Sequence, residues 1–133
     1  MVKKKKYLLD TSVCVALLRK KKGLAEKIAG IGLSNCCISD ITMAEITFGA
    51  VKSENVKHSE DVKKIKTMFK VLPSNECYQE YAEIRVALTK VGLPIMDFDT
   101  LIAATAIHNG LTLVTHNTKH FQRILSLDIE DWE

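Results

Sequence analysis

Residues 97–117, DFDTLIAATAIHNGLTLVTHN, decide the fold class of this chain. The first part, 97–109, is apolar on most sides, as a buried helix is, and Gly110 follows where a helix commonly ends. The second part, 111–115, is short and rich in strand formers, which is typical of a buried strand. A buried helix that leads directly into a buried strand indicates an α/β protein with a mainly parallel sheet.

The same alternation extends through the rest of the chain. Strand-like runs occupy 6–9 and 36–39, with a weaker one at 127–129. Only 53–61, SENVKHSED, has the composition of a polar loop. Apolar residues at helical spacing predict the core faces of three amphipathic helices: Ile41, Ala44, Phe48 and Val51; Val62, Ile65, Phe69 and Leu72; Tyr81, Ile84, Leu88 and Val91.

The composition is that of an ordinary globular protein. The chain has 133 residues, of which 47% are apolar and 26% charged, so we expect one domain over residues 1–133. No apolar run approaches the roughly 20 residues that a bilayer span needs, and the start, MVKKKK, lacks a signal peptide's apolar stretch. We therefore expect a cytoplasmic protein that does not enter a membrane.

Cysteine and lysine usage add weaker information. Cys14, Cys36, Cys37 and Cys77 form no C-x-x-C pair, which favours buried thiols over a metal or disulfide site. The net charge of +3 is compatible with a polyanionic partner. We interpret the densest clusters, 3–6 and 19–22, as a solvated terminus and a solvated helix end that could also contact an RNA backbone.

Two acids do not fit a purely structural interpretation. Asp10 ends the first strand and therefore stands at the carboxyl edge of the sheet, although it could equally cap the following helix. Glu45 shares a predicted helix face with Ile41 and Phe48, which is the apolar stripe. An inward-facing carboxylate needs a partner, so Glu45 should meet either a base in an ion pair or a bound cation.

Two further oxygen-bearing residues follow in the C-terminal half. Asp99 lies in the first turn of the buried helix, where the helix dipole alone could explain it. Asp97 is the better candidate for the N-cap, which leaves Asp99 free for another role. Asn117 follows the strand of 111–115, again at a carboxyl end, where it could also be a simple turn residue.

Residues at carboxyl strand ends meet at one edge of a parallel sheet, which is where such sheets bind ligands. Three carboxylates and an amide oxygen, with no His or Cys among them, would form a hard-oxygen site that suits Mg²⁺ or Mn²⁺ and suits zinc poorly. Without a metal, repulsion within this group would raise at least one carboxyl pKa.

Four segments of the chain resemble the PIN domains of VapC-type toxins from type II toxin–antitoxin systems. They are Tyr-Leu-Leu-Asp-Thr-Ser (7–12), Ala-Glu-Ile (44–46), Asp-Thr-Leu-Ile-Ala-Ala (99–104) and Gly-Leu-Thr-Leu-Val-Thr-His-Asn (110–117). The resemblance spans most of the chain, and the first and last two motifs are specific when found together in this order. It matches Asp10, Glu45 and Asp99 to the family's three acids, and Asn117 to its fourth acidic position, where an amide is a known variant.

The resemblance implies an α/β/α sandwich and Mg²⁺- or Mn²⁺-dependent hydrolysis of RNA phosphodiesters. It also implies homodimerisation and inhibition by a cognate antitoxin. Asp10 and Asp99 would be direct metal ligands, and Glu45 a ligand or the residue that holds the metal's water. Thr11, Ser12 and Thr115 match small polar positions that support the acids, with Ser12 standing where the family commonly has Asn.

The sequence lacks the motifs of several other classes of protein. No G-x-x-x-x-G-K-[ST] loop exists, and Gly30-Ile-Gly32 lacks the third glycine of a dinucleotide loop. His116 and His120 are four residues apart, but Asn117 stands where a metalloprotease helix needs Glu. Two alternatives stay open: a non-catalytic RNA- or partner-binding domain of the same fold, and a nuclease of this fold that acts on DNA.

Overall fold

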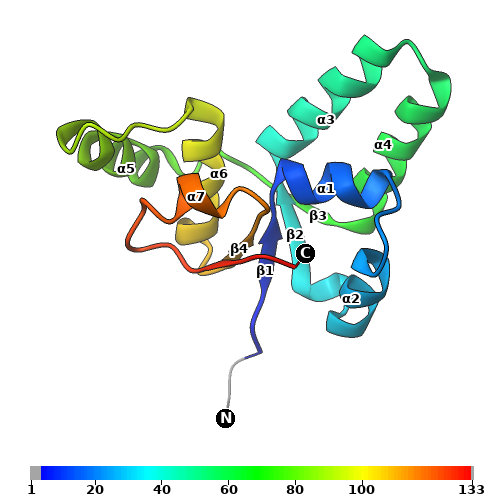
Figure 1. The fold of residues 1–133 in the computed structure, drawn as a ribbon, viewed down its shortest axis with the longest axis horizontal. Coiled ribbons are helices and arrows are strands. Elements are labelled where there is room, and N and C mark those ends of the chain that lie inside the picture. Colours follow the sequence, from blue (N-terminus) through cyan, green and yellow to red (C-terminus); the bar gives the residue numbers. More distant parts are fainter. Residues whose placement is uncertain (1–3, 133) are drawn as a thin grey trace.

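The computed structural model describes residues 4–132, and its strands form one parallel sheet of order β3-β2-β1-β4-β5 (Figure 1). Because every pairing is parallel, all carboxyl ends lie at the same edge, as the sequence predicts. The strands are β1 (Tyr7–Leu9), β2 (Cys36–Ser39), β3 (Lys70–Leu72), β4 (Thr112–Val114) and β5 (Ile129–Glu130).

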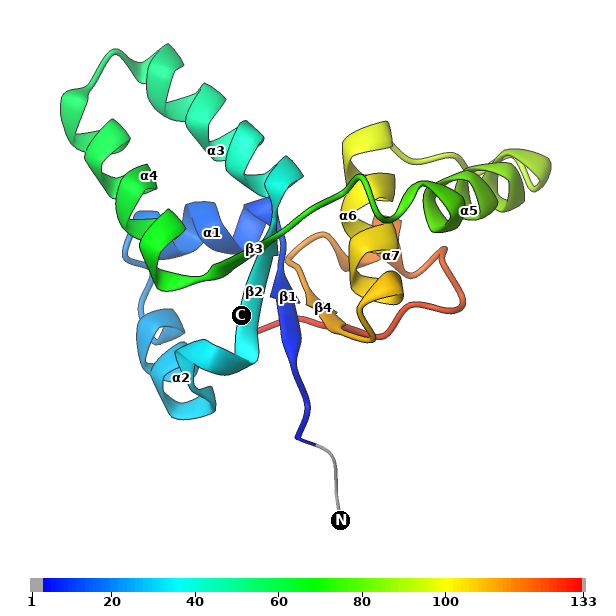
Figure 2. The ribbon, with the colours of Figure 1, turned by 180° about the vertical axis from the view of Figure 1, so that it is seen from behind.

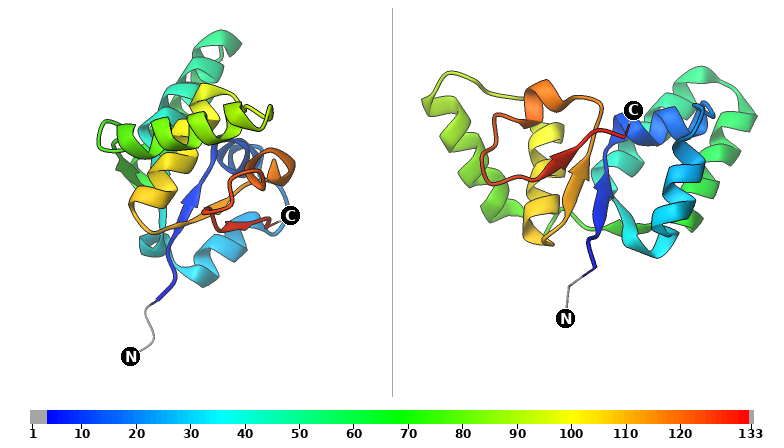
Figure 3. Two further views of the ribbon diagram at one scale, coloured as in Figure 1. Left: turned by 90° about the vertical axis from the view of Figure 1, so that its left-hand side faces the viewer. Right: turned by 60° about the horizontal axis from the view of Figure 1, so that its bottom comes forward.

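Helices cover both faces of the sheet, which confirms the α/β/α sandwich (Figure 3). One face carries α1 (Thr11–Leu18), α2 (Leu24–Ile31), α3 (Asp40–Ser53) and α4 (Val56–Met68), with a short 3-10 turn at Leu33–Asn35. The other face carries α5 (Tyr78–Lys90), α6 (Asp97–His108) and α7 (Thr118–Phe121).

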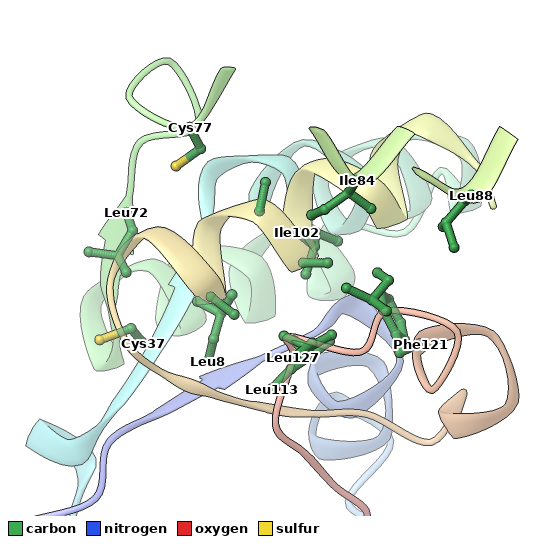
Figure 4. Close-up of a cluster of buried hydrophobic side chains, with 14 residues drawn as sticks. Leu8, Cys37, Leu72, Cys77, Ile84, Leu88, Ile102, Leu113, Phe121 and Leu127 are labelled. Carbon is green, nitrogen blue, oxygen red and sulfur yellow. The ribbon is translucent and has the colours of Figure 1, made fainter. Parts of the chain in front are cut away.

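Alternate residues of the central strands build two separate cores. Leu8 and Leu113 point to the α5–α6 side, where they meet Ile102 and Phe121 (Figure 4), whereas Leu9 joins the core beneath α1 to α4. This period of two is inherent to a strand. Each fully buried leucine contributes about 1.5–3 kcal/mol of transfer free energy. The packing of these leucines against the helices on both sides therefore stabilises the short strands.

Residues 97–115 form the helix and the strand that the sequence predicts. α6 buries Ile102 to Ala106 and ends at His108, after which Gly110 adopts a φ of +65° in the left-handed region. The backbone N–H of Leu111 donates to the carbonyl of Ala106 at 2.8 Å, and the chain turns directly into β4.

The predicted loop at 53–61 is wrong for most of its length. α3 continues to Ser53, the chain turns at Glu54 with a φ of 55°, and α4 begins at Val56. Asn55 caps α4, because its side-chain oxygen accepts a hydrogen bond from the N–H of Lys57 at 2.9 Å. The start of α4 lies in solvent and needs no apolar residues, so this segment has no helical period.

The apolar residues of 62–72 belong to two elements instead of one helix. α4 ends at Met68 and buries Val62 and Ile65, whereas Leu72 lies in β3. β3 is only three residues long and buries one of them, which leaves too little pattern to predict a strand. β5 begins at Ile129, two residues after the start of the predicted 127–129, and ends at Glu130.

The predicted inward face of α3 is also wrong. Phe48 is 67% exposed and Val51 68% exposed, whereas the buried residues of α3 are Thr42, Ile46 and Ala50. α3 and α4 project together beyond the sheet as an antiparallel pair (Figures 1 and 2), and Ile46 and Ala50 share a core with α4. The stripe of Phe48 and Val51 is therefore left in solvent.

The four cysteines are buried free thiols, as predicted. Burial raises the pKa of Cys36 to about 11, so this thiol stays protonated at neutral pH. The lysine and arginine side chains of 4–6 and 19–22 are exposed, and Lys3 lies outside the described residues. Within residues 4–132, no helix is both long and apolar enough to cross a bilayer.

Candidate functional site

Asp10 lies at the carboxyl end of β1 and is only 4% exposed. Its Oδ1 accepts hydrogen bonds from the N–H of Val13 at 3.1 Å and from Ser12 Oγ at 2.6 Å. Its Oδ2 accepts a hydrogen bond from Thr115 Oγ1 at 2.5 Å. Asp10 is therefore both the N-cap of α1 and a carboxylate at the sheet edge, so the two interpretations open at the sequence level hold together.

Thr115 and Ser12 tie the loop after β4 to Asp10. Thr115 Oγ1 accepts a hydrogen bond from the N–H of Asn117 at 2.9 Å while it donates to Asp10. Ser12 Oγ accepts a hydrogen bond from the N–H of His116 at 3.2 Å. These bonds join α1 to a loop more than 100 residues away in sequence and fix the orientation of the Asp10 carboxylate.

Glu45 lies on α3 and is half-buried against the start of α1. Its Oε1 accepts a hydrogen bond from Thr11 Oγ1 at 2.7 Å, and Thr42 Oγ1 lies 3.1 Å from the same hydroxyl. The ion pair considered from the sequence is not found: within residues 4–132, no lysine, arginine or histidine is paired with Glu45.

Asp99 lies in the first turn of α6 and is half-buried. Burial raises the pKa of its carboxyl group, the negative charges of Glu45 and then Asp10 raise it further, and His120 opposes them. The N-cap predicted at Asp97 is wrong, because the cap residue is Met96. Asp97 instead contacts α5, because its Oδ1 accepts a hydrogen bond from the Tyr81 hydroxyl at 3.0 Å.

The three acids thus come from the starts of α1 and α6 and from the first half of α3, which all lie at the edge toward which β1 points (Figure 1). Within the described residues, no three His, Cys, Asp or Glu side chains form a ready-made metal cage. Carboxylates that repel one another stay apart until a cation offsets their charge. Their oxygen donors fit Mg²⁺ or Mn²⁺ in chemistry.

Asn117 lies after β4 with its side chain turned to His120. The amide Nδ2 is 2.9 Å from His120 Nδ1, so the amide donates and the ring nitrogen accepts. The amide oxygen of Asn117 is therefore the atom that is available to another partner. From the sequence, His120 is considered only as half of a metalloprotease pair and its contact with Asn117 is missed, although the spacing of three residues could have indicated it.

Asp40 is a second residue that sequence reasoning missed. It follows β2 as Asp10 follows β1, so the same rule could have found it. Its Oδ2 accepts a hydrogen bond from the N–H of Ser74 at 3.1 Å, which anchors the connection from β3 to α5. Its Oδ1 is buried and has no hydrogen-bond partner among the described residues.

A family model for the PIN domain matches residues 7–125. The chain is 31% identical over 129 residues to the tRNA(fMet)-specific endonuclease VapC of Shigella flexneri, with 96% of this chain and 98% of the relative covered. The chain belongs to the PIN-domain family, in its VapC group.

Solved structures agree with this assignment. The DNA-bound VapBC from Salmonella typhimurium superposes with a TM-score of 0.91 at 32% identity, covering 97% of this chain and 99% of that one. A toxin–antitoxin complex from Klebsiella pneumoniae superposes with a TM-score of 0.69 at 26% identity, covering 92% and 95% of the two chains.

Proposed function

We propose that this chain is a divalent-metal-dependent endoribonuclease and the toxin of a toxin–antitoxin pair. Two observations carry the proposal: Asp10, Glu45 and Asp99 come from three helices at one sheet edge, and no basic side chain among residues 4–132 is paired with Glu45. A protein rarely keeps such a group of carboxylates together unless a cation uses it. The VapC endonuclease of Shigella flexneri, similar over nearly the full length, supports RNA as the substrate.

The metal, when bound, would activate a water for attack and offset the charge on the attacked phosphate. Asp10 and Asp99 would hold it, with Asp10 oriented by Ser12 and Thr115. Glu45 would serve as a third ligand or orient a water, with its own direction set by Thr11. The amide oxygen of Asn117 would add a neutral oxygen donor beside these acids.

The Asp99→Asn variant is the cleanest test of this proposal. Asp99 has no hydrogen bond to another described residue, whereas Asp10 caps a helix, so replacing Asp10 would also disturb the fold. Loss of a metal ligand removes several kcal/mol of transition-state stabilisation, so we expect RNA cleavage to fall about 100-fold or more. The measurement is single-turnover cleavage with Mg²⁺ or Mn²⁺, with circular dichroism as the folding control.

Two outcomes of the same assay would contradict the proposal. Wild-type rates from the folded Asp99→Asn protein would remove Asp99 from the site, and full turnover in EDTA would remove the metal. No cleavage by the wild type at all would favour the alternative of a non-catalytic binding domain. Parallel assays with RNA and DNA of the same sequence decide between the two kinds of nuclease.

The proposal extends to partners and location. The toxin–antitoxin complex from Klebsiella pneumoniae supports a protein antitoxin as the inhibitor of this chain. We also propose a homodimer that acts in the cytoplasm. Light scattering after size-exclusion chromatography measures the oligomeric state of the purified chain, and a mass equal to one chain at micromolar concentration would contradict the dimer.

A further inference from the structure

A cavity of about 530 Å³ lies between α5 and α6, beside the first turn of α6. Its size falls within the range of small-ligand sites in proteins. The two helices pack against each other on one face of the sheet (Figure 2). Pro94, Ile95 and Met96 of their connection line the cavity. The lining residues that matter here are Arg85, Leu88, Pro94, Met96, Asp97 and Phe98.

The polar part of the lining is balanced in charge and consists of an exposed ion pair. Arg85 Nη1 donates to the Tyr81 hydroxyl at 2.7 Å and lies 3.4 Å from Asp97 Oδ1, to which Tyr81 also donates at 3.0 Å. The guanidinium group has five N–H donors and the carboxylate several lone pairs, so both keep unused capacity. A neutral ligand with donors and acceptors along its edge suits this pair better than an ion does.

Most of the remaining lining is apolar, and part of it is open to solvent. Phe98 is 51% exposed and Met96 76% exposed, although both are large apolar side chains, while Leu88 is buried at the base. An exposed aromatic ring next to paired polar groups suits a flat heterocycle, which can stack on the ring and bond through its edge. Unpaired nucleobases have both properties.

The cavity also lies next to the acid site, where a base of the substrate strand would be. Met96, Asp97, Phe98 and Thr100 line it, and Asp99 lies within the same helical turn but is electrostatically coupled to Glu45 and Asp10. The acid site by itself repels phosphate, so an RNA strand needs contacts outside it. We propose that this cavity seats one unpaired base of the RNA strand beside the cleaved phosphate, an inference that rests on the proposed function.

The first test measures binding without cleavage. Asp99→Asn serves as the background, and the probe is a fluorescein-labelled, single-stranded RNA of eight nucleotides, followed by anisotropy. Stacking of one base is worth a factor of about 5 to 150 in affinity, and the exposure of Phe98 places the expected loss for Phe98→Ala at the lower end. Phe98→Tyr should retain binding, because it keeps an aromatic face.

Phe48→Ala is the matched control, since Phe48 is also exposed but lies on α3, away from the cavity. It should bind the probe as the background protein does. Equal affinities for the Phe98→Ala and Phe48→Ala proteins would overturn the inference. A change in the sedimentation coefficient caused by Phe98→Ala would also overturn it, because the cavity would then be a contact with a second copy of the chain.

The second test locates the base. In a substrate whose cleavage site has been mapped, each nucleotide near the cut is replaced in turn by an abasic one. For the wild type, one position should raise KM by about 5-fold or more with little change in kcat, and for Phe98→Ala the same replacement should have no effect. If the wild type cleaves the substrate but no position shows this effect, the inference about the cavity is wrong and the proposed nuclease activity stands. If the wild type does not cleave RNA, the proposed function is wrong. The binding test then still decides whether the cavity binds a base.

Discussion

Asp99 carries a charge that the folded protein disfavours when no cation is bound. Its pKa is raised by burial, then by Glu45 and Asp10. A carboxyl group with a raised pKa binds more protons in the folded state, so its contribution to the free energy of unfolding falls as pH rises from the ordinary aspartate range through the raised value. At neutral pH without metal, Asp99 therefore destabilises the fold.

We expect Asp99→Asn to melt at a higher temperature than the wild type at neutral pH in EDTA. The difference should shrink in acid, where wild-type Asp99 is protonated, and it should shrink again when Mg²⁺ offsets the charge. Thermal melting across pH 4–8, with and without Mg²⁺, measures this. A variant that is less stable than the wild type at neutral pH would show that Asp99 has a structural partner.

Asn117 brings to the site an oxygen without a charge. Asn117→Asp adds a fourth carboxylate, and ligand charge tunes divalent-cation affinity at oxygen sites by orders of magnitude. We expect it to lower the Mg²⁺ concentration for half-maximal cleavage, yet not to improve metal-free RNA binding, because the added charge repels phosphate. An unchanged or raised Mg²⁺ requirement would return Asn117 to the role of a turn residue.

The contact with His120 supplies the control for this test. His120→Ala removes the acceptor for the Asn117 amide and should raise the Mg²⁺ requirement of a protein that keeps Asn117. His120→Asn places an oxygen near the lost nitrogen and should restore part of the effect. Calorimetric titration with Mn²⁺ reads metal affinity directly, independent of cleavage.

Residues at strand ends could be predicted from the sequence, because the end of a buried strand is visible and its place in a parallel sheet is fixed by topology. Asp10 and Asn117 are of this kind. The helical spacing places Glu45 on an inward face for a wrong reason, since Phe48 on that stripe is exposed. Glu45 is half-buried because α1 and Thr11 pack against it, and no local pattern contains that contact.

The C-terminal strand β5 supports the candidate site through Thr115. The N–H of Thr115 donates to the carbonyl of Glu130 at 3.0 Å, and Thr115 in turn holds Asp10. Trp132 anchors this segment, with its ring in an edge contact with Tyr7 at a centroid distance of 5.0 Å. Its indole N–H donates to Glu130 Oε1 at 3.0 Å.

We expect Trp132→Ala to lower the free energy of unfolding by about 1–3 kcal/mol, because it removes an aromatic pair and part of its buried area. Urea denaturation followed by circular dichroism measures the loss, and Trp132→Phe should recover much of it. A change below about 0.5 kcal/mol, the usual effect of a surface substitution, would mean that the C-terminal segment does not stabilise the sheet.

Long elements with a buried face were predictable, and short or projecting ones were not. α6 shows its burial on most sides and ends at a glycine, so its sequence contains the whole signal. β3 buries a single residue, and α4 begins in solvent, so tertiary contacts decide both. The α3–α4 pair extends beyond the sheet, which is a property of packing that no periodicity within either helix records.

The acid site is a group of carboxylates, Asp10, Glu45 and Asp99, whose charge a partner can neutralise. Arginine binds carboxylates in a bidentate manner, so we expect the antitoxin to insert an arginine near Asp10 and Asp99. Replacing that arginine by lysine should weaken inhibition of cleavage even though the charge is kept, and alanine should weaken it further. Unchanged inhibition after mutation of every arginine in the antitoxin's toxin-binding tail would exclude this mechanism.

The order of the sheet also bears on synthesis by the ribosome. β1 is made first, but its partner β4 and the Asp10–Thr115 bond come 105 residues later. At about 5–20 residues per second, Asp10 therefore spends about 5–20 seconds without the loop that orients it. An acid site that depends on Thr115 therefore cannot hold Asp10 in its final orientation until this late segment has been made.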